Sequence, residues 1–500
     1  MFFTTFHLSL HSLVFLLLDI SDNIMYLCKK YAKLKNVMTS RRLVFLPLLM
    51  IDFLLLSVFC GCGEDRWKEY YPFTGKSLWI DSVMRENYLW YEDIPSFDEL
   101  NYFMDPKEFL DEMRSPRDKG FSSIDTIYDT PPICYGFDYT LYRMGENDTA
   151  YTALITYVTP QSPAADAGIK RGEWIMMVDD SIYLTQKTET ILSQSMDSHK
   201  LTIGKYEIMH TEDGEEIGVI SSDRIVQLPE ARPVNDITIP AYTILTTQNG
   251  NVGYLVYNSF DRQADAELCR LSQEFSSQNV KDFILDLRYN KGGQMECVQL
   301  LAAILAPQTT KDCPLATLEY NSKQAETKNR MLFFENTTSY SMQNLNLNRL
   351  FILTGQNTEA AAEMLINSLT PYMEVILIGE QTKGNYVGTE SFVTARYPWK
   401  LNLAVCEVKN ANKEAIYTDG FSPDISINPL EDPQYILPLG HPQEALLRVA
   451  LQMIDGSFQN QKKSVQQNVT EFYMIQEFAS RRKQSRSTPK GLIISAPKQL

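Results

Sequence analysis

The chain has 500 residues, of which 44% are hydrophobic and 22% charged, a composition that excludes an intrinsically disordered protein and suffices for two or three packed domains. Its formal net charge is −16. The part from Cys62 onward holds 40 basic and 59 acidic residues, so its balance is 40 − 59 = −19. Such a surface repels polyanions, and we expect no nucleic-acid partner.

Cysteine and histidine usage gives no metal pattern. Five cysteines follow the first 62 residues, widely spaced and without a Cys-x-x-Cys pair, and the five histidines lie in no ligand spacing. We expect buried thiols, no metal site and no cofactor. These cysteines are Cys134, Cys269, Cys297, Cys313 and Cys406.

Residues 1–61 are predicted to form an N-terminal extension with a signal segment. Arg41 and Arg42 precede a long apolar run, and Gly61-Cys62 follows it, an order typical of secretion signals. The segment resembles a bacterial lipoprotein signal, which implies lipidation of Cys62 as the mature N-terminus. An uncleaved membrane anchor is the alternative. Both hypotheses place the protein in the cell envelope, at a membrane facing the periplasm or the cell surface, and we expect translation to start at Met38.

Residues 66–128 are predicted to form a small helical domain. Pro106 favours the start of a helix, and Pro116 with Gly120 favours its end. We interpret the aromatic and apolar stripe at helical spacing as core, and a ligand-binding role for its rings is the alternative. The stripe comprises Leu78, Trp79, Val83, Tyr88, Leu89, Trp90, Tyr91, Phe103, Phe109, Leu110 and Met113.

Residues 131–205 contain the segment SPAADAGIKRGEWI, which begins at Ser162. It resembles the PDZ motif Ser-Pro-Ala-x-x-Ala-Gly-(Leu/Ile)-x-x-Gly-Asp-x-Ile, with Glu173 in place of Asp. The resemblance implies a loop that binds a peptide's C-terminal carboxylate while the peptide adds as a strand to the sheet edge. Asp138 in that loop would repel a carboxylate. A domain that only packs against its neighbour is the alternative. The loop comprises Tyr135, Gly136, Phe137, Asp138 and Tyr139.

Residues 206–455 alternate predicted strands and helices. Strands are predicted at 252–257 and 283–288, with a helix at 264–276 between them and a last helix at 442–454. Alternation of this kind indicates a mostly parallel sheet covered by helices, so the predicted fold class is α/β.

The segment from Leu350 to Gly388 holds the candidate chemistry. It reads as a strand at 350–354, a turn, an Ala-rich helix and a strand at 374–379. Asn357 or Thr358 is expected to accept from the first N–H groups of that helix. α/β hydrolytic enzymes place a nucleophile at such a turn, because a helix N-terminus stabilises developing negative charge.

Several motifs resemble the C-terminal-processing, or tail-specific, serine peptidases with a PDZ domain. Glu363 matches the last position of the family's Ser-Ala-Ser-Ala-Ser-Glu turn. Residues 379–384 match Gly-Glu-x-Thr-x-Gly, residues 285–293 match Leu-Asp-Leu-Arg-x-Asn-x-Gly-Gly, and residues 420–424 match Gly-x-x-Pro-Asp. The resemblance covers roughly residues 131–455 and implies a ClpP/crotonase-like core with a PDZ-like β domain and a small helical N-terminal domain.

The resemblance places the family's nucleophilic Ser on Ala360 and its general-base Lys on Asn385. A methyl group has no proton to give and an amide is not a base, so neither catalytic group is retained. A displaced pair is the alternative, with Thr358 as hydroxyl and Lys383 as amine. The implied oxyanion-hole donors are the backbone N–H groups of Gly292 or Gly293 and of Ala361.

Residues 456–500 are predicted to be a polar basic tail, solvated or weakly helical. A tail that folds back on the acidic body or touches anionic lipid is the alternative.

Three functions remain open. The first is a membrane-anchored pseudo-peptidase that binds extended or C-terminal peptide segments, or unfolded protein, without cutting them. The second is an active serine-type endopeptidase that uses the displaced pair. The third, suggested by retinoid-binding relatives of the core, is a small-molecule binder.

Overall fold

The computed structural model of the protein describes residues 67–127, 131–143, 149–185, 187–210, 216–415, 417–459, 473–476, 491–495 and 498–499. The predicted signal segment and Cys62 lie outside these residues. The chain divides into two compact units, Met1–Pro72 and Phe73–Leu500, and the boundary falls within the helix Trp67–Asn87. No helix within the described ranges is long and apolar enough to cross a membrane.

A helical segment comes first, as predicted. Its main helices are α3 (Trp67–Asn87) and α4 (Pro106–Met113), and α4 begins where the Asp105 carboxylate accepts the N–H of Lys107 at 3.0 Å. The predicted stripe is largely buried, but Phe103 is 61% exposed, so its prediction as core was wrong. The fully or nearly fully buried members of the stripe are Val83, Tyr88, Trp90, Phe109, Leu110 and Met113.

A seven-stranded antiparallel sheet forms the β domain, in the region where a PDZ-like domain is predicted. The sheet extends past the predicted boundary at residue 205, because the last two strands, β7 and β8, form one long hairpin that ends at Leu228. Its strands are β3 (Phe137–Arg143), β4 (Thr152–Val158), β5 (Trp174–Val178), β6 (Ile182–Tyr183), β7 (His199–His210), β8 (Glu216–Leu228) and β21 (Tyr473–Gln476); its helices are α5 (Pro163–Asp166) and α6 (Thr190–Gln194).

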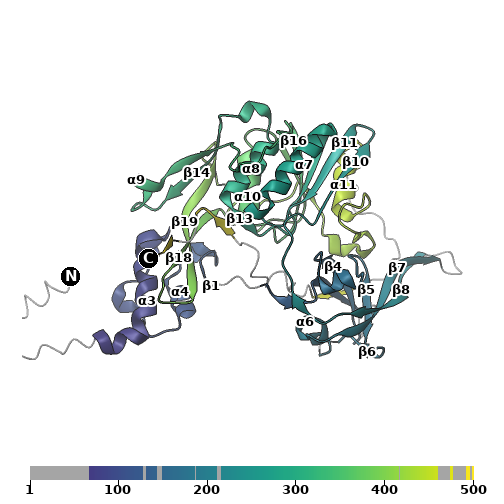
Figure 1. The fold of residues 1–500 in the computed structure, drawn as a ribbon, viewed down its shortest axis with the longest axis horizontal. Coiled ribbons are helices and arrows are strands. Elements are labelled where there is room, and N and C mark those ends of the chain that lie inside the picture. The colour runs from purple at the N-terminus through teal and green to yellow at the C-terminus, as the bar shows by residue number, and fades with distance from the viewer. Residues whose placement is uncertain are drawn as a thin grey trace, which may run out of the picture. The chain divides into compact units, whose positions relative to one another are not determined.

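The core contains the predicted mostly parallel sheet. Its order is β10-β11-β12-β16-β17-β20, and only β10 and β11 pair antiparallel. Helix α11 packs on one face, whereas α7, α8 and α10 cover the other (Figure 1). These elements are β10 (Ala241–Thr247), β11 (Gly250–Val256), α7 (Asp265–Ser277), β12 (Val280–Asp286), α8 (Met295–Leu305), β16 (Arg349–Thr354), α10 (Ala361–Leu369), β17 (Glu374–Gly379), β20 (Ile425–Ser426) and α11 (Ala445–Ile454).

A second, mixed sheet of eight strands completes the core, and no sequence pattern predicted it. Its order is β13-β22-β18-β19-β14-β15, with β1 paired to β19 and β23 to β18. Its strands are β1 (Ser123–Thr126), β13 (Gly292–Gln294), β14 (Pro314–Tyr320), β15 (Arg330–Phe333), β18 (Val387–Val393), β19 (Trp399–Asn410), β22 (Gly491–Ile493) and β23 (Lys498–Gln499).

The described parts of the tail correct another prediction. Residues 491–493 are a strand inside this second sheet, and the side chains of Leu492 and Ile494 are only 1% and 2% exposed. These residues are therefore core rather than solvated. They were missed because the charged residues before them dominate the composition of residues 456–500.

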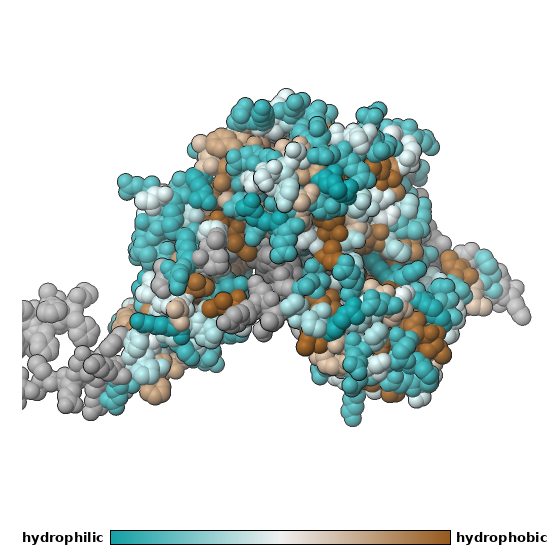
Figure 2. Space-filling view, in the orientation of Figure 1, coloured by the Kyte–Doolittle hydropathy of each residue, from teal (hydrophilic) through white to brown (hydrophobic). Residues whose placement is uncertain are grey.

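The surface and the cysteines can be compared with what the composition predicts. The face seen in Figure 2 is mostly hydrophilic, with small hydrophobic patches. Cys134, Cys269, Cys297 and Cys406 are buried free thiols, as predicted, whereas Cys313 is partly exposed.

Candidate functional site

The strand-turn-helix unit forms as predicted, with β16 leading into α10. Thr358 does not cap the helix as expected. Its hydroxyl donates to the Leu287 carbonyl oxygen at 2.9 Å and accepts the Gly355 N–H at 3.0 Å, which fixes the turn to the end of β12. The side chain is fully buried and both hydrogen-bonding roles serve the turn.

Ala360, the family's nucleophile position, lies at the sharpest point of this turn. Its φ is 55° and its ψ −102°, a region that side-chain-bearing residues rarely adopt, and it is 1% exposed. Strained turns of this kind present nucleophiles at the top of α/β sheets. The backbone of a nucleophile elbow is thus retained, with a methyl group in place of a hydroxyl.

Glu363 links this turn to the segment that carries the family's base position. Its buried carboxylate accepts the N–H groups of Ala360 (3.0 Å), Gly384 (2.7 Å) and Asn385 (2.8 Å) and the hydroxyl of Thr382 (2.5 Å). Burial raises the pKa of Glu363 to about 7, and these hydrogen bonds oppose the rise. The matched motif Glu therefore has a structural role, because it holds the two halves of the site together.

The family's two catalytic positions are adjacent in space. The backbone N–H groups of Ala360 and Asn385 donate to the same oxygen, Oε2 of Glu363. The side-chain amide of Asn385 then donates to the Glu359 carboxylate at 3.1 Å. The backbones of the two positions are therefore held side by side, and an amide bound to a carboxylate stands at the position of the base.

The displaced pair is adjacent in its backbone, but the Thr358 side chain is buried and the Lys383 side chain is exposed. Lys383 donates its backbone N–H to the Thr358 carbonyl oxygen at 3.0 Å, but its side chain is exposed and forms no hydrogen bond or ion pair within the described residues. Lys383 lines an open groove of about 810 Å³ together with Asn357, Glu359 and Glu380. The Thr358 hydroxyl is buried on its own backbone partners.

Gly292 and Gly293, the predicted oxyanion donors, lie in a turn with positive φ of 113° and 135°. A Cβ at Gly293 would lie 2.2 Å from the Phe260 carbonyl oxygen, so only glycine fits. The Gly292 N–H already donates to the Asn290 side chain at 2.9 Å. The third predicted donor, Ala361, is the first residue of α10.

The predicted carboxylate-binding loop contributes mostly to the core of the β domain. Tyr135, Phe137 and Tyr139 are at most 8% exposed and pack in one apolar cluster, and the Tyr135 hydroxyl donates to the Asp197 carbonyl oxygen at 2.5 Å. Gly136 has the positive φ, 82°, that a tight loop requires. Asp138 is 7% exposed and borders a pocket rather than open solvent.

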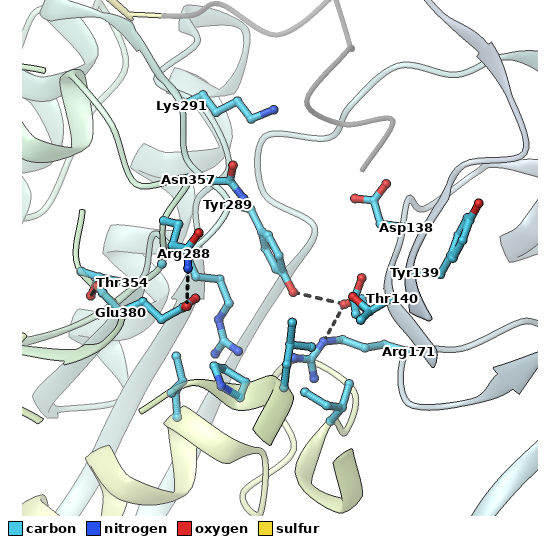
Figure 3. Close-up of a pocket in the computed structure, with 17 residues that line it drawn as sticks. Asp138, Tyr139, Thr140, Arg171, Arg288, Tyr289, Lys291, Thr354, Asn357 and Glu380 are labelled. Atoms are coloured by element: carbon cyan, nitrogen blue, oxygen red, sulfur yellow. Dashed lines mark hydrogen bonds between the residues drawn. The ribbon is translucent and has the colours of Figure 1, made fainter. Parts of the chain in front are cut away.

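That pocket, of about 90 Å³, lies where the β domain meets the core (Figure 3). Tyr289 from the core and Arg171 from the β domain both donate to the Thr156 carbonyl oxygen, at 3.1 and 2.9 Å. Asp138 and Thr140 approach the pocket from β3.

A buried ionic cluster beneath the pocket was not predicted. Arg288 donates to both oxygens of Glu444 at 2.6 and 3.0 Å and to Asp286 at 2.9 Å, and Arg171 donates to Glu444 at 3.1 Å. Burial alone would raise the pKa of Glu444, but the two guanidinium groups lower it to about 2. The Leu-Asp-Leu-Arg motif contains two members of the cluster, Asp286 and Arg288. Nothing in the sequence identified Glu444 as their partner.

Fold and site together define the class of protein: an α/β protein of the serine-peptidase type. The model of peptidase family S41 matches residues 251–427, and the model of the S41 N-terminal domain matches residues 78–123. A crystal structure assigned to the S41 proteases, from Bacteroides fragilis, is 41% identical with a TM-score of 0.72, and the match covers 76% of this chain and 98% of that one. This chain belongs to peptidase family S41, the C-terminal-processing proteases.

Curated relatives are more distant. A carboxyl-terminal-processing protease of Picosynechococcus is 26% identical over 234 residues, 45% of this chain and 49% of the relative. The chloroplastic carboxyl-terminal-processing peptidase 3 of Arabidopsis thaliana is 25% identical over 253 residues, 49% of this chain and 44% of the relative. The chain thus spans about half the length, or less, of the curated relatives it matches.

Proposed function

We propose that this S41-family chain is a pseudo-peptidase, which binds extended or C-terminal peptide segments without cutting them. One observation carries the proposal: Ala360 and Asn385 donate to one oxygen of Glu363, so the dyad positions are adjacent but hold a methyl group and an amide. Neither side chain can activate or act as a nucleophile. The open groove beside Glu359 and Lys383 offers room for an extended peptide.

The geometry does not favour the two other functions. An active endopeptidase with a displaced pair requires the Thr358 hydroxyl, which is bound to Leu287 and Gly355. Small-molecule sites are clefts or cavities of roughly 300–1,000 Å³ with a mostly apolar lining. The pocket between the β domain and the core has about 90 Å³, and the larger groove beside Lys383 is lined by polar and charged residues.

Two assays on the whole protein test the proposal. A serine-directed phosphonate probe should leave the protein unlabelled, and casein should stay intact, while a peptide array should show binding to a subset of extended sequences. Labelling by the probe, or casein hydrolysis that is lost in Thr358→Ala or Lys383→Ala, would establish an active enzyme instead.

We also propose that a lipid on Cys62 anchors the protein at a membrane of the cell envelope. The order of Arg41-Arg42, apolar run and Gly61-Cys62 supports this anchor. The protein should fractionate with membranes, and Cys62→Ser should release it. Unchanged processing and unchanged membrane association of Cys62→Ser would refute the anchor.

A further inference from the structure

Residues 491–494 run through the second sheet beside the candidate site. Strand β22 lies between β13 and β18 and is parallel to both, with Gly491 opposite Gly292 and Leu492 opposite Gly388. The Gly491 N–H donates to the Lys291 carbonyl oxygen at 3.0 Å. Ile494 donates its N–H to the Thr389 carbonyl oxygen at 3.1 Å, and the Thr389 hydroxyl donates to the Leu492 carbonyl oxygen at 2.8 Å.

The two strands that flank β22 both come from the candidate site. Strand β13 begins at Gly292, in the predicted oxyanion turn, and β18 begins at Val387, two residues after the base position. A Cβ on Gly292 would lie 2.1 Å from the Gly491 carbonyl oxygen, so the tail backbone lies directly against that turn. Since β13 joins the sheet through β22, its edge and that of β18 form a two-sided slot for one extended segment.

The same stretch of chain also covers the edge of the β domain. Strand β21 pairs antiparallel with β3, the strand that follows the predicted carboxylate-binding loop. The other neighbour of β3 is β4, so β21 takes the edge at which an added peptide strand would lie. Two parts of one tail therefore lie where a bound peptide would add to each sheet.

We propose that residues 491–494 are an intramolecular ligand: they close the slot between β13 and β18, and the slot accepts in their place extended peptides with large aliphatic side chains at alternate positions. This inference rests on the proposed peptide-binding function and adds both the occupant and the ligand class. Release of the tail opens the site.

The occupant defines the ligand chemistry. Leu492 and Ile494 point into the core cluster, whereas Ile493 between them is only half-buried, the alternation of a strand. Gly491 has a φ of 73° and precedes them. Backbone pairing tolerates any sequence, so the two buried side chains select the peptide. A matching ligand has the pattern Gly, aliphatic, any residue, aliphatic.

The experiment measures binding of a fluorescein-labelled peptide with the sequence of residues 488–497, TPKGLIISAP, by anisotropy. The proteins are the full-length wild type, the double variant Leu492→Asp with Ile494→Asp, and the matched variant Ile493→Asp. Buried charges expel the tail in the double variant. In the wild type the tail occupies the slot, so only molecules with an open slot can bind the peptide and the apparent affinity falls in proportion to their fraction. The double variant should therefore bind the peptide at least about tenfold more tightly than wild type. Ile493→Asp should change affinity far less, and a peptide with Asp in place of the matching Leu and second Ile should not bind.

Hydrogen exchange on the unmodified wild type provides a second readout that needs no folded variant. Amides of residues 491–494 should exchange faster than those of β19, because the tail opens without global unfolding. Exchange as slow as in β19, or a folded double variant that gains no binding, overturns the inference. If peptides still bind on the array after either of these results, the proposed peptide-binding function stands and only the role of the tail is refuted. If the tail opens but no peptide binds, the proposed function and this inference are both contradicted.

Discussion

Backbone N–H groups from two segments of the chain meet on Glu363, and this residue sets the shape of the site. Its carboxylate accepts hydrogen bonds from four donors. Three of them are backbone N–H groups, which cannot accept a hydrogen bond from a protonated Glu363. Burial nevertheless raises its pKa from 4.5 to about 7. Between pH 4.5 and about 7, the folded state therefore holds a proton on Glu363 that the unfolded chain has released.

This proton predicts a pH dependence of stability. Because the folded pKa lies above the unfolded one, the contribution of Glu363 is fully present below about pH 4.5 and is lost as pH rises through about 7, a change of about 3 kcal/mol. Glu363→Gln removes this titration but also loses hydrogen-bond acceptors. The variant should have a lower free energy of unfolding than wild type at pH 5, and this difference in free energy should be smaller at pH 8. Urea unfolding at both pH values measures it, and a gap that stays constant would contradict the raised pKa.

The missing dyad gives a second prediction at this scale. Ala360→Ser combined with Asn385→Lys should restore weak casein cleavage, and neither change alone should, because a hydroxyl and its base act as a unit. Glu359 will limit the gain: it accepts from Asn385 at 3.1 Å and would pair with a lysine there, keeping the amine charged. Adding Glu359→Ala should therefore raise activity further.

The four variants are compared in one hydrolysis assay with wild type as the baseline. Activity in either single variant equal to that of the double variant would show that the two positions do not cooperate. A double variant that folds and binds peptide but stays inactive, even with Glu359→Ala, would show that the elbow at Ala360 has lost more than its hydroxyl.

At the scale of elements, the sheet edges explain the choice of ligand. The edge of strand β3 is occupied by β21, and the aromatic side chains of the preceding loop are buried in the β domain. Asp138 contributes a carboxylate beside the pocket. Main-chain pairing and side-chain pockets are therefore expected to supply most of the affinity, rather than recognition of a terminal carboxylate.

Amidating the C-terminus of a bound peptide tests this expectation. Affinity should change by less than about tenfold, which corresponds to about 1.4 kcal/mol. Titration of one array-selected peptide in its acid and amide forms measures the difference, with a peptide extended by two residues as a control for end effects. A larger loss on amidation would show that the loop at Gly136 recognises the carboxylate.

Elements with a local signal could be predicted from sequence, and those defined by distant pairing could not. The strand-helix-strand unit at 349–379 and the helix at 265–277 follow from apolar periodicity and turn residues. Strand β22 has only three residues and follows a basic stretch, so no local pattern identifies it. Ala360 and Asn385 could be placed by motif, but the joint hydrogen bonds to Glu363 depend on tertiary structure.

At the scale of the whole second unit, one buried ionic cluster connects the β domain with the core. Glu444 caps α11, accepts from Leu446 and Leu447 N–H groups, and binds Arg288 and Arg171. Because Arg171 belongs to the motif segment of the β domain, the carboxylate joins parts of the chain far apart in sequence. Its removal would take away the carboxylate that Arg171 binds and leave Arg288 with Asp286 alone.

Glu444→Gln should therefore cost about 3–5 kcal/mol of unfolding free energy at pH 7, since removing one member of a buried ion pair leaves the other charge uncompensated. The matched control is Asp419→Asn, which breaks an ion pair between Lys119 and an 86% exposed Asp419, and it should change stability by less than about 1 kcal/mol.

The pKa of Glu444 is lowered to about 2, so its stabilisation is present above pH 4.5 and is lost as pH falls toward 2, opposite in sign to that of Glu363. Urea unfolding of the three proteins at pH 7 and pH 3 should show a smaller gap between wild type and Glu444→Gln at the lower pH. A Glu444→Gln variant as stable as Asp419→Asn would mean that the cluster does not hold the β domain and the core together.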